Sequence, residues 1–565
     1  MVKKRGFWLL LFLLSLVSCS IHPSSSNGTN SSSNTTYEKD DEGFFILEDD
    51  YFTSTSKKDG KEASLLKIPK AIESKKYASM RLYAGEQMIP IYNVKTNYAH
   101  TWNANAPERM NNAVATIELK GKMTFKLQTN FLIHDSCTIR PLNASVPFTI
   151  DEQRRVVTFT ISSPGQYTIE FRSEKTLHLF VNEYNAYDTY KNSENVIYFG
   201  PGLHNKDNST YIQNDNYVHL NSNTTIYLEL GAIIEGGFIS YRSSNIKIVG
   251  SGIVDGSIFV RDANTNERLI PYDFSYCNNI TFLGTTNLDP AGWCYNLYFS
   301  SEINMDNIKI ISSRSNGDGI SLQSCQNATI TNSFVRAWDD ALVVKNYPEW
   351  SNLTSYGTTK NIKFENCLVW TDLAQSMEIG YETYGKIMED ITFKNITVLH
   401  NFHKAVISIH NGNQAEIKRV NFEDITIEDA SMGKGDGVPY LIDFTTTFSS
   451  TWSMGHGKTP LGSIDEVYVK NVKVIDERQT MLLHFEGAMD TRSEYYGSLH
   501  EIQNIHLEDI DIAKEKLTST SSRIKTNEYV KNLSVSSKLN DVTGAKWIAS
   551  YDESIYGSEY IVAIA

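Results

Sequence analysis

Cysteine is scarce in this chain, with only 6 among 565 residues. Five of them follow the N-terminal segment, at Cys137, Cys277, Cys294, Cys325 and Cys367. None of these five is placed as a CxxC pair or with the Cys/His spacing of a metal site, and their odd number argues against a disulfide framework. We expect most of them to be small buried residues, and we predict no metal and no other cofactor.

Positive charge is also in deficit. Lys and Arg together number 52, against 66 Asp and Glu, which gives a formal net charge of −14. This balance disfavours nucleic acid and anionic membrane surfaces as partners. It is also a poor match for a strongly polyanionic substrate, unless a local basic cleft outweighs the overall charge.

A long apolar run is missing as well. Residues 7–17 are apolar but too few to span a bilayer comfortably, and they follow three basic residues at 3–5. This is the pattern of an export signal. It ends in Leu16-Val17-Ser18-Cys19, which resembles the lipobox of bacterial lipoproteins. The resemblance implies a lipid anchor on Cys19 that holds the exported protein at a membrane, facing the periplasm or the cell surface; an ordinary secretory signal is the alternative.

Short alternating runs fill the region between residues 81 and 185. Residues 113–119, 124–127 and 156–161 read as strands, and residues 165–171 alternate cleanly between polar and apolar. Several short strands separated by turn residues predict a β-sandwich.

Beyond residue 196 a four-residue pattern repeats, in most copies an Asn or Asp followed by two apolar residues that flank a polar one. The copies begin at Asn245, Asn279, Asn307, Asn327, Asn361, Asp390, Arg419, Glu466 and Asn504. Their spacings are 34, 28, 20, 34, 29, 29, 47 and 38 residues. Short strands of fixed pattern joined by turns of variable length indicate a solenoid.

Amphipathic helical stretches are scarce, so a leucine-rich or helical repeat fits poorly. A β-propeller would need four strands per blade and a closing period, which the sequence does not show. We therefore predict an all-β chain in which a right-handed parallel β-helix of the pectin lyase-like class follows a β-sandwich. The predicted divisions are a signal peptide at 1–19, a flexible tether and lead-in at 20–75, the sandwich at 76–190 and the catalytic β-helix at 191–565.

Two short motifs within the repeat carry three carboxylates. Asp318 lies in Asn316-Gly317-Asp318-Gly319, and Asp339 and Asp340 lie in Trp338-Asp339-Asp340, 21 residues further on. That separation is about one coil, so on a β-helix the motifs would lie roughly 5 Å apart. Like charges this close push their pKa values apart into acid and base roles. The alternative is that these are only turn residues.

One geometric demand follows for the adjacent pair. Successive strand residues point to opposite faces, yet Asp339 and Asp340 would both have to reach one cleft. We therefore predict a bulge or a strand end at this pair.

The motifs resemble those of polygalacturonase-like β-helix glycosidases of family 28. Residues 248–256 are similar to an early-coil signature of that family. Asn316-Gly317-Asp318 and Trp338-Asp339-Asp340 match the positions of its Asn-Thr-Asp and Gly-Asp-Asp motifs. The chain also resembles the dextranase-like family 49, which shares the aspartates and places a β-sandwich before the β-helix; Val398-Leu399-His400-Asn401 is similar to a stretch of those enzymes. The two families remain open at this point.

Two motifs of the polygalacturonases are absent. Their Gly-His-Gly is replaced within residues 374–380, and their Arg-Ile-Lys, which holds the galacturonate carboxylate, has its nearest counterpart at 404–409 without the arginine. Both losses weaken a pectin assignment and leave the carboxylates intact.

The resemblance implies an inverting glycoside hydrolase that cleaves a polysaccharide or oligosaccharide. Asp339 would be the general acid, and Asp318 with Asp340 would position and deprotonate the water, with acid and base carboxyls roughly 6.5–9.5 Å apart. Candidate substrate-binding residues are Lys345, Gln375, Glu378, Tyr381, His400, His403, Lys404 and His410. Trp293 and Trp338 are candidates for stacking on sugars.

Two other functions fit the same fold. A polysaccharide lyase would use calcium with an Arg or Lys base and release unsaturated products. A noncatalytic glycan-binding surface protein would show no turnover at all.

Overall fold

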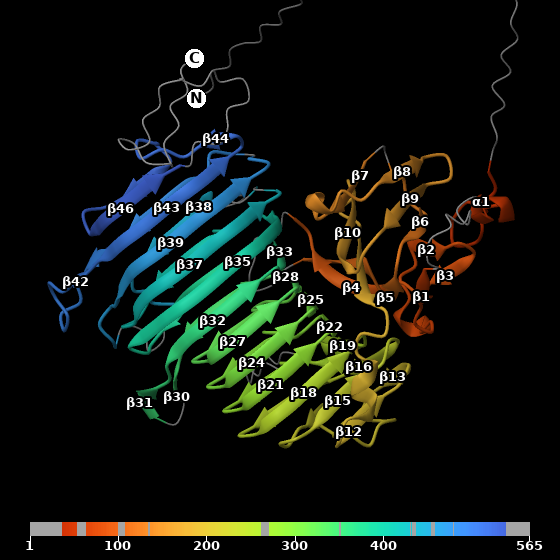
Figure 1. The fold of residues 1–565 in the computed structure, drawn as a ribbon, viewed down its shortest axis with the longest axis horizontal. Helices are drawn as coiled ribbons and strands as arrows, with labels where there is room; N and C mark the ends of the chain where they lie inside the picture. The colour runs from red at the N-terminus through yellow and green to blue at the C-terminus, as the bar shows by residue number, and fades with distance from the viewer. Residues whose placement is uncertain are drawn as a thin grey trace, which may run out of the picture.

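The computed structural model describes residues 37–53, 64–99, 108–133, 136–260, 270–349, 352–429, 431, 437–453, 458–477 and 479–537. A β-sandwich lies against the side of a long β-helix (Figure 1). Helical structure is confined in these ranges to α1 (Asp49–Thr53), η1 (Glu73–Lys75), η2 (Leu142–Ala144), η3 (Asp188–Asn192) and η4 (Gly256–Ile258). None of the helices described is long and apolar enough to cross a membrane. Cys19 and the Ser/Asn-rich stretch at 24–36 lie outside the described residues.

The sandwich consists of two sheets that enclose one apolar core. The first sheet contains β1 (Leu65–Lys67), β5 (Arg109–Lys120), β11 (Thr176–Glu183), β10 (Gly165–Phe171), β7 (Cys137–Arg140) and β4 (Tyr92–Asn97). The second contains β3 (Gln87–Ile89), β2 (Met80–Ala84), β6 (Met123–Thr129), β9 (Val156–Ile161) and β8 (Phe148–Asp151). The four strands predicted from alternation fall in β5, β6, β9 and β10, because the alternating residues face this core.

The sandwich begins before residue 76, where the sequence pattern had placed its start. Strand β1 pairs with β5, with Leu66 opposite Leu119. Further upstream, Phe44 is 1% exposed, and Asp40 Oδ2 lies 2.6 Å from Arg81 Nη1. The prediction that residues 20–75 form a tether and lead-in is therefore wrong for residues 37–53 and 64–75, which pack on the sandwich.

The β-helix consists of two parallel assemblies of strands, as predicted. One face is an 11-stranded sheet of β14 (Tyr217–His219), β17 (Gly237–Tyr241), β20 (Tyr272–Ser275), β23 (Tyr295–Tyr298), β26 (Ile320–Gln323), β29 (Leu342–Asn346), β34 (Met377–Thr383), β36 (Ile407–Asn411), β38 (Tyr440–Thr445), β40 (Leu482–Glu486) and β45 (Ile524–Thr526).

The other two faces merge into a 20-stranded sheet. Its strands are β12 (Val196–Phe199), β13 (Gly202–His204), β15 (Thr225–Leu228), β16 (Ala232–Glu235), β18 (Ser244–Gly250), β19 (Ile253–Asp255), β21 (Asn278–Leu283), β22 (Thr286–Leu288), β24 (Ser301–Asp306), β25 (Lys309–Ile311), β27 (Gln326–Thr331), β28 (Phe334–Ala337), β32 (Thr359–Glu365), β33 (Leu368–Thr371), β35 (Ile387–Asn401), β37 (Glu416–Ile427), β39 (Ser463–Val474), β43 (Ile502–Ile512), β44 (Glu515–Lys516) and β46 (Val530–Ser536). Two small ribbons, β30 (Pro348–Glu349) with β31 (Asn352–Tyr356) and β41 (Ala488–Met489) with β42 (Leu499–His500), project from the coils.

The repeated Asn or Asp marks the corners of the coils. All nine residues that begin the predicted repeats have a positive φ, from 52° at Glu466 to 59° at Asn245. Asparagine adopts this left-handed conformation more readily than most residues. Its side chain also bonds to the coil below, as Asn279 Nδ2 donates to Asn245 Oδ1 at 2.7 Å. The turn residue thus bends each coil and joins it to its neighbour.

One copy of the repeat belongs to a different corner. Asn307 lies at the corner between β24 and β25. Asn279 in β21 and Asn327 in β27 lie at another corner, where β24, the strand between them in the sheet, has Glu302. The short spacing of 20 residues before Asn327 therefore does not measure a coil. The sequence pattern mixed the two corners because both use asparagine at positive φ.

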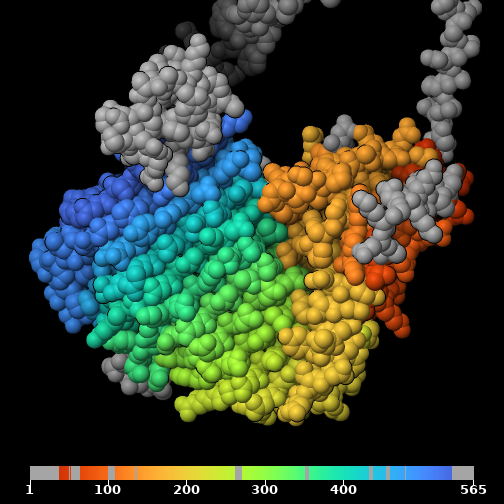
Figure 2. All heavy atoms as spheres, viewed as in Figure 1, coloured from red at the N-terminus to blue at the C-terminus, as the bar shows by residue number. Residues whose placement is uncertain are grey.

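The sandwich and the β-helix share an apolar interface. Tyr92, Val94, Val114 and Phe180 of the sandwich pack with residues of the β-helix, namely Ile233, Ile253, Leu288, Ile311, Phe334 and Leu399. These side chains come from the face of the 20-stranded sheet that borders the sandwich. Figure 2 shows the sandwich seated on the early and middle coils, while the last coils (blue) stand away from it.

Candidate active site

The outer face of the 11-stranded sheet brings the predicted carboxylates together. Ile320 in β26 pairs with Leu342 in β29, and Gly319 N–H donates to Asp340 C=O at 2.9 Å. Asp318 and Asp340 both lie two residues before these paired positions. They therefore occupy equivalent places on neighbouring coils, whose backbones are about 4.8 Å apart.

The adjacent pair lies at a turn, as the geometric argument predicted. Strand β28 ends at Ala337 and β29 begins at Leu342, so Asp339 and Asp340 precede the strand. Both residues remain partly exposed, whereas Asp318 is 3% exposed. The backbone N–H of Gln375, on the next coil, donates to Asp340 Oδ1 at 3.0 Å and fixes that carboxyl.

Crowding of negative charge favours a bound proton at this turn. Burial raises the pKa of Asp340 well above its usual value, and the nearby carboxylates of Asp339, Asp318 and Glu378 raise it further. Lys345 opposes the shift without cancelling it.

Lys345 in β29 supplies the opposite charge. Its Nζ lies 3.7 Å from Asp318 Oδ2 and 3.1 Å from Glu382 Oε2. Burial would lower the pKa of Lys345, but Glu382 and its other acidic neighbours hold it well above its usual value. The same Nζ lies 5.5 Å from the ring centroid of Trp293, which is partly exposed. Lys345 therefore lies between the carboxylates of Asp318 and Glu382.

The next two coils add Glu378, His410 and Tyr381 to the same face. His410 Nδ1 lies 2.8 Å from Glu378 Oε1, and the hydroxyl of Ser408 donates to the other oxygen of Glu378. Tyr381 stacks on the His410 ring, with centroids 4.3 Å apart and planes 3° from parallel. Glu378 and Tyr381 thus lie beside the aspartates, although Glu378 is only 1% exposed.

A row of alternating charge continues from this point along the sheet. His410 Nε2 lies 3.1 Å from Asp443 Oδ2, and His484 Nδ1 lies 2.8 Å from Asp443 Oδ1. Burial alone would lower the pKa of His410, but Glu378 and Asp443 raise it to about 10. Burial would raise the pKa of Asp443, but hydrogen bonds from the two histidines lower it to about 2. His410 is therefore an imidazolium across the neutral range.

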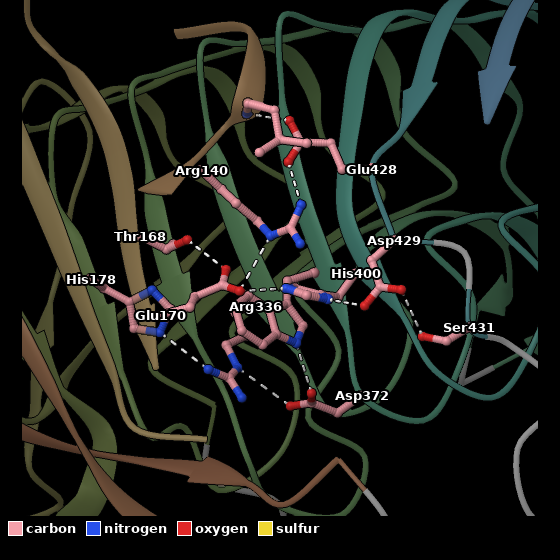
Figure 3. Close-up of polar contacts among 12 residues, drawn as sticks. Arg140, Thr168, Glu170, His178, Arg336, Asp372, His400, Glu428, Asp429 and Ser431 are labelled. Atoms are coloured by element: carbon pink, nitrogen blue, oxygen red, sulfur yellow. Dashed lines mark hydrogen bonds and ion pairs between the residues drawn. The ribbon is translucent and has the colours of Figure 1, made fainter. Parts of the chain in front are cut away.

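His400, which we predicted to bind substrate, lies away from this face. It sits at the end of β35, where Nδ1 is 2.7 Å from Asp429 Oδ2 and Nε2 is 3.0 Å from Glu170 Oε2 of the sandwich (Figure 3). Both ring nitrogens are engaged and the residue is 7% exposed. The structure thus gives His400 a role in joining the two parts of the chain, and this corrects the prediction.

Further ion pairs surround His400 at the same interface. Arg140 of the sandwich reaches Glu428 at 2.8 Å and Glu170 at 3.2 Å (Figure 3). Below it, Arg336 lies 3.2 Å from His178 Nε2 and 3.5 Å from Asp372. Each buried charge has a partner, which is what makes such an interface tolerable in a low dielectric.

The remaining candidate substrate-binding residues lie either next to the three aspartates or further from them. Gln375 is partly exposed in the turn before β34 and contacts Asp340 through its backbone. Lys404 is exposed in the turn before β36, and His403 beside it is 2% exposed. Trp338 is fully buried and has no surface to offer a sugar. Among the described residues, no group of three His, Cys, Asp or Glu is arranged to hold a metal ion.

Sequence reasoning did not find Glu382, Asp443 or His484. Asp443 in β38 pairs in register with Ser408 in β36, and His484 in β40 pairs in register with Asp443, so they lie one and two coils beyond β36. The alternation within β38 and β40 marks both as outward-facing, which is the available signal. The long and unequal loops between these strands hid the register that brings them into one row.

These features define a parallel β-helix with a carboxylate cluster on the outer face of one sheet. Residues 206–438 match the family model for glycosyl hydrolases family 28. The predicted resemblance to polygalacturonase-like β-helix glycoside hydrolases is thereby confirmed. Among curated proteins, none matches the sequence significantly.

Solved structures match the chain at low sequence identity. Dex49A from Penicillium minioluteum matches with a TM-score of 0.56 and 14% identity, over 81% of this chain and 93% of that chain. This coverage extends over both the sandwich and the β-helix, and it shows the shared fold. An exopolygalacturonase from Thermotoga maritima matches with a TM-score of 0.38 and 16% identity, over 60% of this chain and 83% of its own.

The doubly paired His410 predicts a specific dependence of stability on pH. Its folded pKa of about 10 exceeds the ordinary value of 6.5, so its charge contributes stability fully below pH 6.5, and that contribution is lost as the pH rises through about 10. We expect His410→Gln to lower the urea midpoint at pH 6 and to approach wild type near pH 10. His219→Gln, at an exposed position, is the control. A deficit that stays constant from pH 6 to pH 10 would contradict this assignment.

Proposed function

We propose that this protein is an inverting glycoside hydrolase that cleaves a polysaccharide with Asp318, Asp339 and Asp340. The observation that carries the proposal is the register that stacks Asp318 on Asp340 at one turn, with Asp339 beside them. Glycosidic cleavage needs an acid and a base on opposite sides of the scissile bond, and this cluster supplies three carboxyls for these two roles.

The charges suggest how the roles divide. The raised pKa of Asp340 indicates that the Asp339–Asp340 pair holds a proton, and we propose that Asp339 delivers it to the leaving oxygen, as the family resemblance implies. Asp318, whose Oδ2 lies 3.7 Å from Lys345 Nζ, accepts the proton of the attacking water, with Asp340 helping to position that water. Inversion requires the acid and base carboxyls to lie roughly 6.5–9.5 Å apart with the water between them.

Loss of the acid tests the mechanism directly. We expect Asp339→Asn to lower kcat about 10²–10⁴-fold, the usual contribution of a general acid, with folding retained. Asp318→Asn should lose activity similarly, while Asp306→Asn, on the opposite sheet, should keep it. Reducing-end assays measure the rates, and NMR of the first products should show the inverted anomer. A retained anomer would exclude the inverting mechanism, and full activity of Asp339→Asn would remove this residue from it.

The charge of the face favours a neutral glycan, as in the dextranase-like alternative, over a polyuronate. Lys345 already lies between Asp318 and Glu382, and His410 already lies between Glu378 and Asp443. A substrate carboxylate would therefore compete with protein carboxylates for each of these cations. Sugar hydroxyls, by contrast, donate hydrogen bonds to carboxylates without charge repulsion.

A substrate panel separates these possibilities. We expect hydrolysis of neutral polysaccharides such as α-glucans to exceed that of polygalacturonate at least about 10²-fold, since an unpaired uronate in this field would cost several kcal/mol. Product size and reducing ends are the readouts. Ultraviolet-absorbing unsaturated products would instead establish a lyase, and the absence of turnover on every glycan would favour a glycan-binding protein.

We also propose that the protein is an exported lipoprotein anchored through Cys19. The support is the basic, apolar and Leu16-Val17-Ser18-Cys19 succession in the sequence. Growth with a radiolabelled fatty acid should label the wild-type protein in the membrane fraction, and Cys19→Ala should abolish the label. Equal labelling of both would refute the anchor.

A further inference from the structure

A polar groove lies on the outer face of the 20-stranded sheet, whereas the aspartates border the 11-stranded sheet. The strands that carry the groove, β32, β35, β37 and β39, face the viewer in Figure 1. Its volume of about 470 Å³ falls within the roughly 300–1,000 Å³ of ligand-binding clefts. The residues that line it are Asn361, Asp390, Thr392, Arg419, Asn421, Glu466 and Tyr468.

The register of the coils builds the floor and one end of this groove. Thr392 pairs with Asn421, and Asn421 pairs with Tyr468, so their outward side chains form one column along the axis of the β-helix. The first two side chains are short and the third is a large ring, so Tyr468 ends the groove. Within the part of the chain that the structure describes, the side chains of Thr392 and Asn421 and the Tyr468 hydroxyl bond to no other residue.

The ring of Tyr468 is supported from behind. His506, its in-register neighbour on the following coil, stacks on it with centroids 4.6 Å apart and planes 15° from parallel. Ser534 Oγ lies 2.9 Å from His506 Nδ1 and holds the imidazole. Because Asn421 is the neighbour on the other side, the opposite face of the tyrosine ring borders the groove. Lys470 Nζ, 4.9 Å from the ring centroid, adds a hydrogen-bond donor beside it.

The rim of the groove is charged, but its cations are already paired. Arg419 donates to Asp390 at 2.7 Å and to Glu389 at 2.5 Å, and Lys360 Nζ lies 2.8 Å from Glu389. Glu466 adds a further carboxylate to the same rim. An anionic ligand would therefore compete with protein carboxylates for both cations. Hydroxyl groups of a neutral ligand can donate to these carboxylates without charge repulsion.

We propose that this groove is a second glycan-binding site, which holds a segment of a neutral polysaccharide. The apolar C–H face of a sugar packs on an aromatic ring, while its hydroxyls both donate and accept hydrogen bonds. Tyr468 supplies the ring, and Thr392, Asn421 and the rim supply the polar groups. Binding here needs none of the aspartates. Its catalytic use rests on the proposed function: a chain held at the groove raises the local concentration of substrate for the other face.

Counting the binding sites tests the proposal. Calorimetric titration of the full chain carrying Asp339→Asn, which limits turnover, should show binding of neutral α- or β-glucan oligosaccharides. Adding Tyr468→Ala should weaken binding at the groove at least about tenfold, as truncation of a central aromatic contact does, and remove one site from the titration. Tyr468→Phe keeps the ring and should retain the site. Tyr198→Ala is the matched control, because it removes a 47% exposed ring that stacks on Tyr227 in the first coils of the same sheet.

The outcomes separate this site from the proposed hydrolase. Binding that depends on Tyr468, in a protein that hydrolyses no glycan, would support the groove and refute the hydrolase. Hydrolysis with the same site number and affinity in Tyr468→Ala would overturn the groove alone. Failure of every neutral oligosaccharide to bind at a site that depends on Tyr468, or tighter binding of galacturonate oligosaccharides there, would also overturn the proposal.

A second variant covers the case in which Tyr468→Ala does not fold. Asn421→Tyr keeps the Tyr468–His506 stack and places another ring on the groove floor, in register with Tyr468. It should fill the groove and remove the same site, with a urea midpoint close to that of wild type. The rate on short soluble oligosaccharides should not change, since the aspartates are untouched. Retained binding in Asn421→Tyr would contradict the assignment.

Discussion

The in-register pairing of parallel coils is the constraint on which the rest of this molecule depends. Each strand of the 11-stranded sheet bonds to the same position of its neighbours, so residues a coil apart in sequence lie about 4.8 Å apart in space. The three aspartates, the Lys345 cation and the Glu378–His410 pair meet only because of this pairing. A slip of one residue in any coil would turn its outward side chains into the core.

The same constraint concentrates charge, and the protein balances it by alternation. Along the outer face, carboxylates and cations follow one another from Asp318 and Lys345 to Glu378, His410, Asp443 and His484. The pKa of Asp340 is raised where this row begins, because burial and the neighbouring carboxylates disfavour its charge. Elsewhere in the row the charges stabilise one another.

The sequence predicted the fold class and the carboxylate cluster because both leave local signals. Strand alternation and the asparagine corners have fixed short periods, and the spacing between Asp318 and Asp339 approximates one coil. It misplaced His400, because nothing local reveals that Glu170, far upstream in the sandwich, occupies its second ring nitrogen. It likewise placed the start of the sandwich too late, since the pairing of β1 with β5 joins distant segments. Long-range contacts of this kind carry no short-range pattern.

The corner loops have a consequence for how such a chain diversifies. Val420 of β37 pairs with Val467 of β39 in the same register that joins Ile391 to Val420, although the connecting segments differ greatly in length. Insertions between strands therefore project outside the stack of coils and leave the pairing of neighbouring strands unchanged. Loop length at the rim of the proposed substrate face can therefore change while Asp318 and Asp340 keep their register.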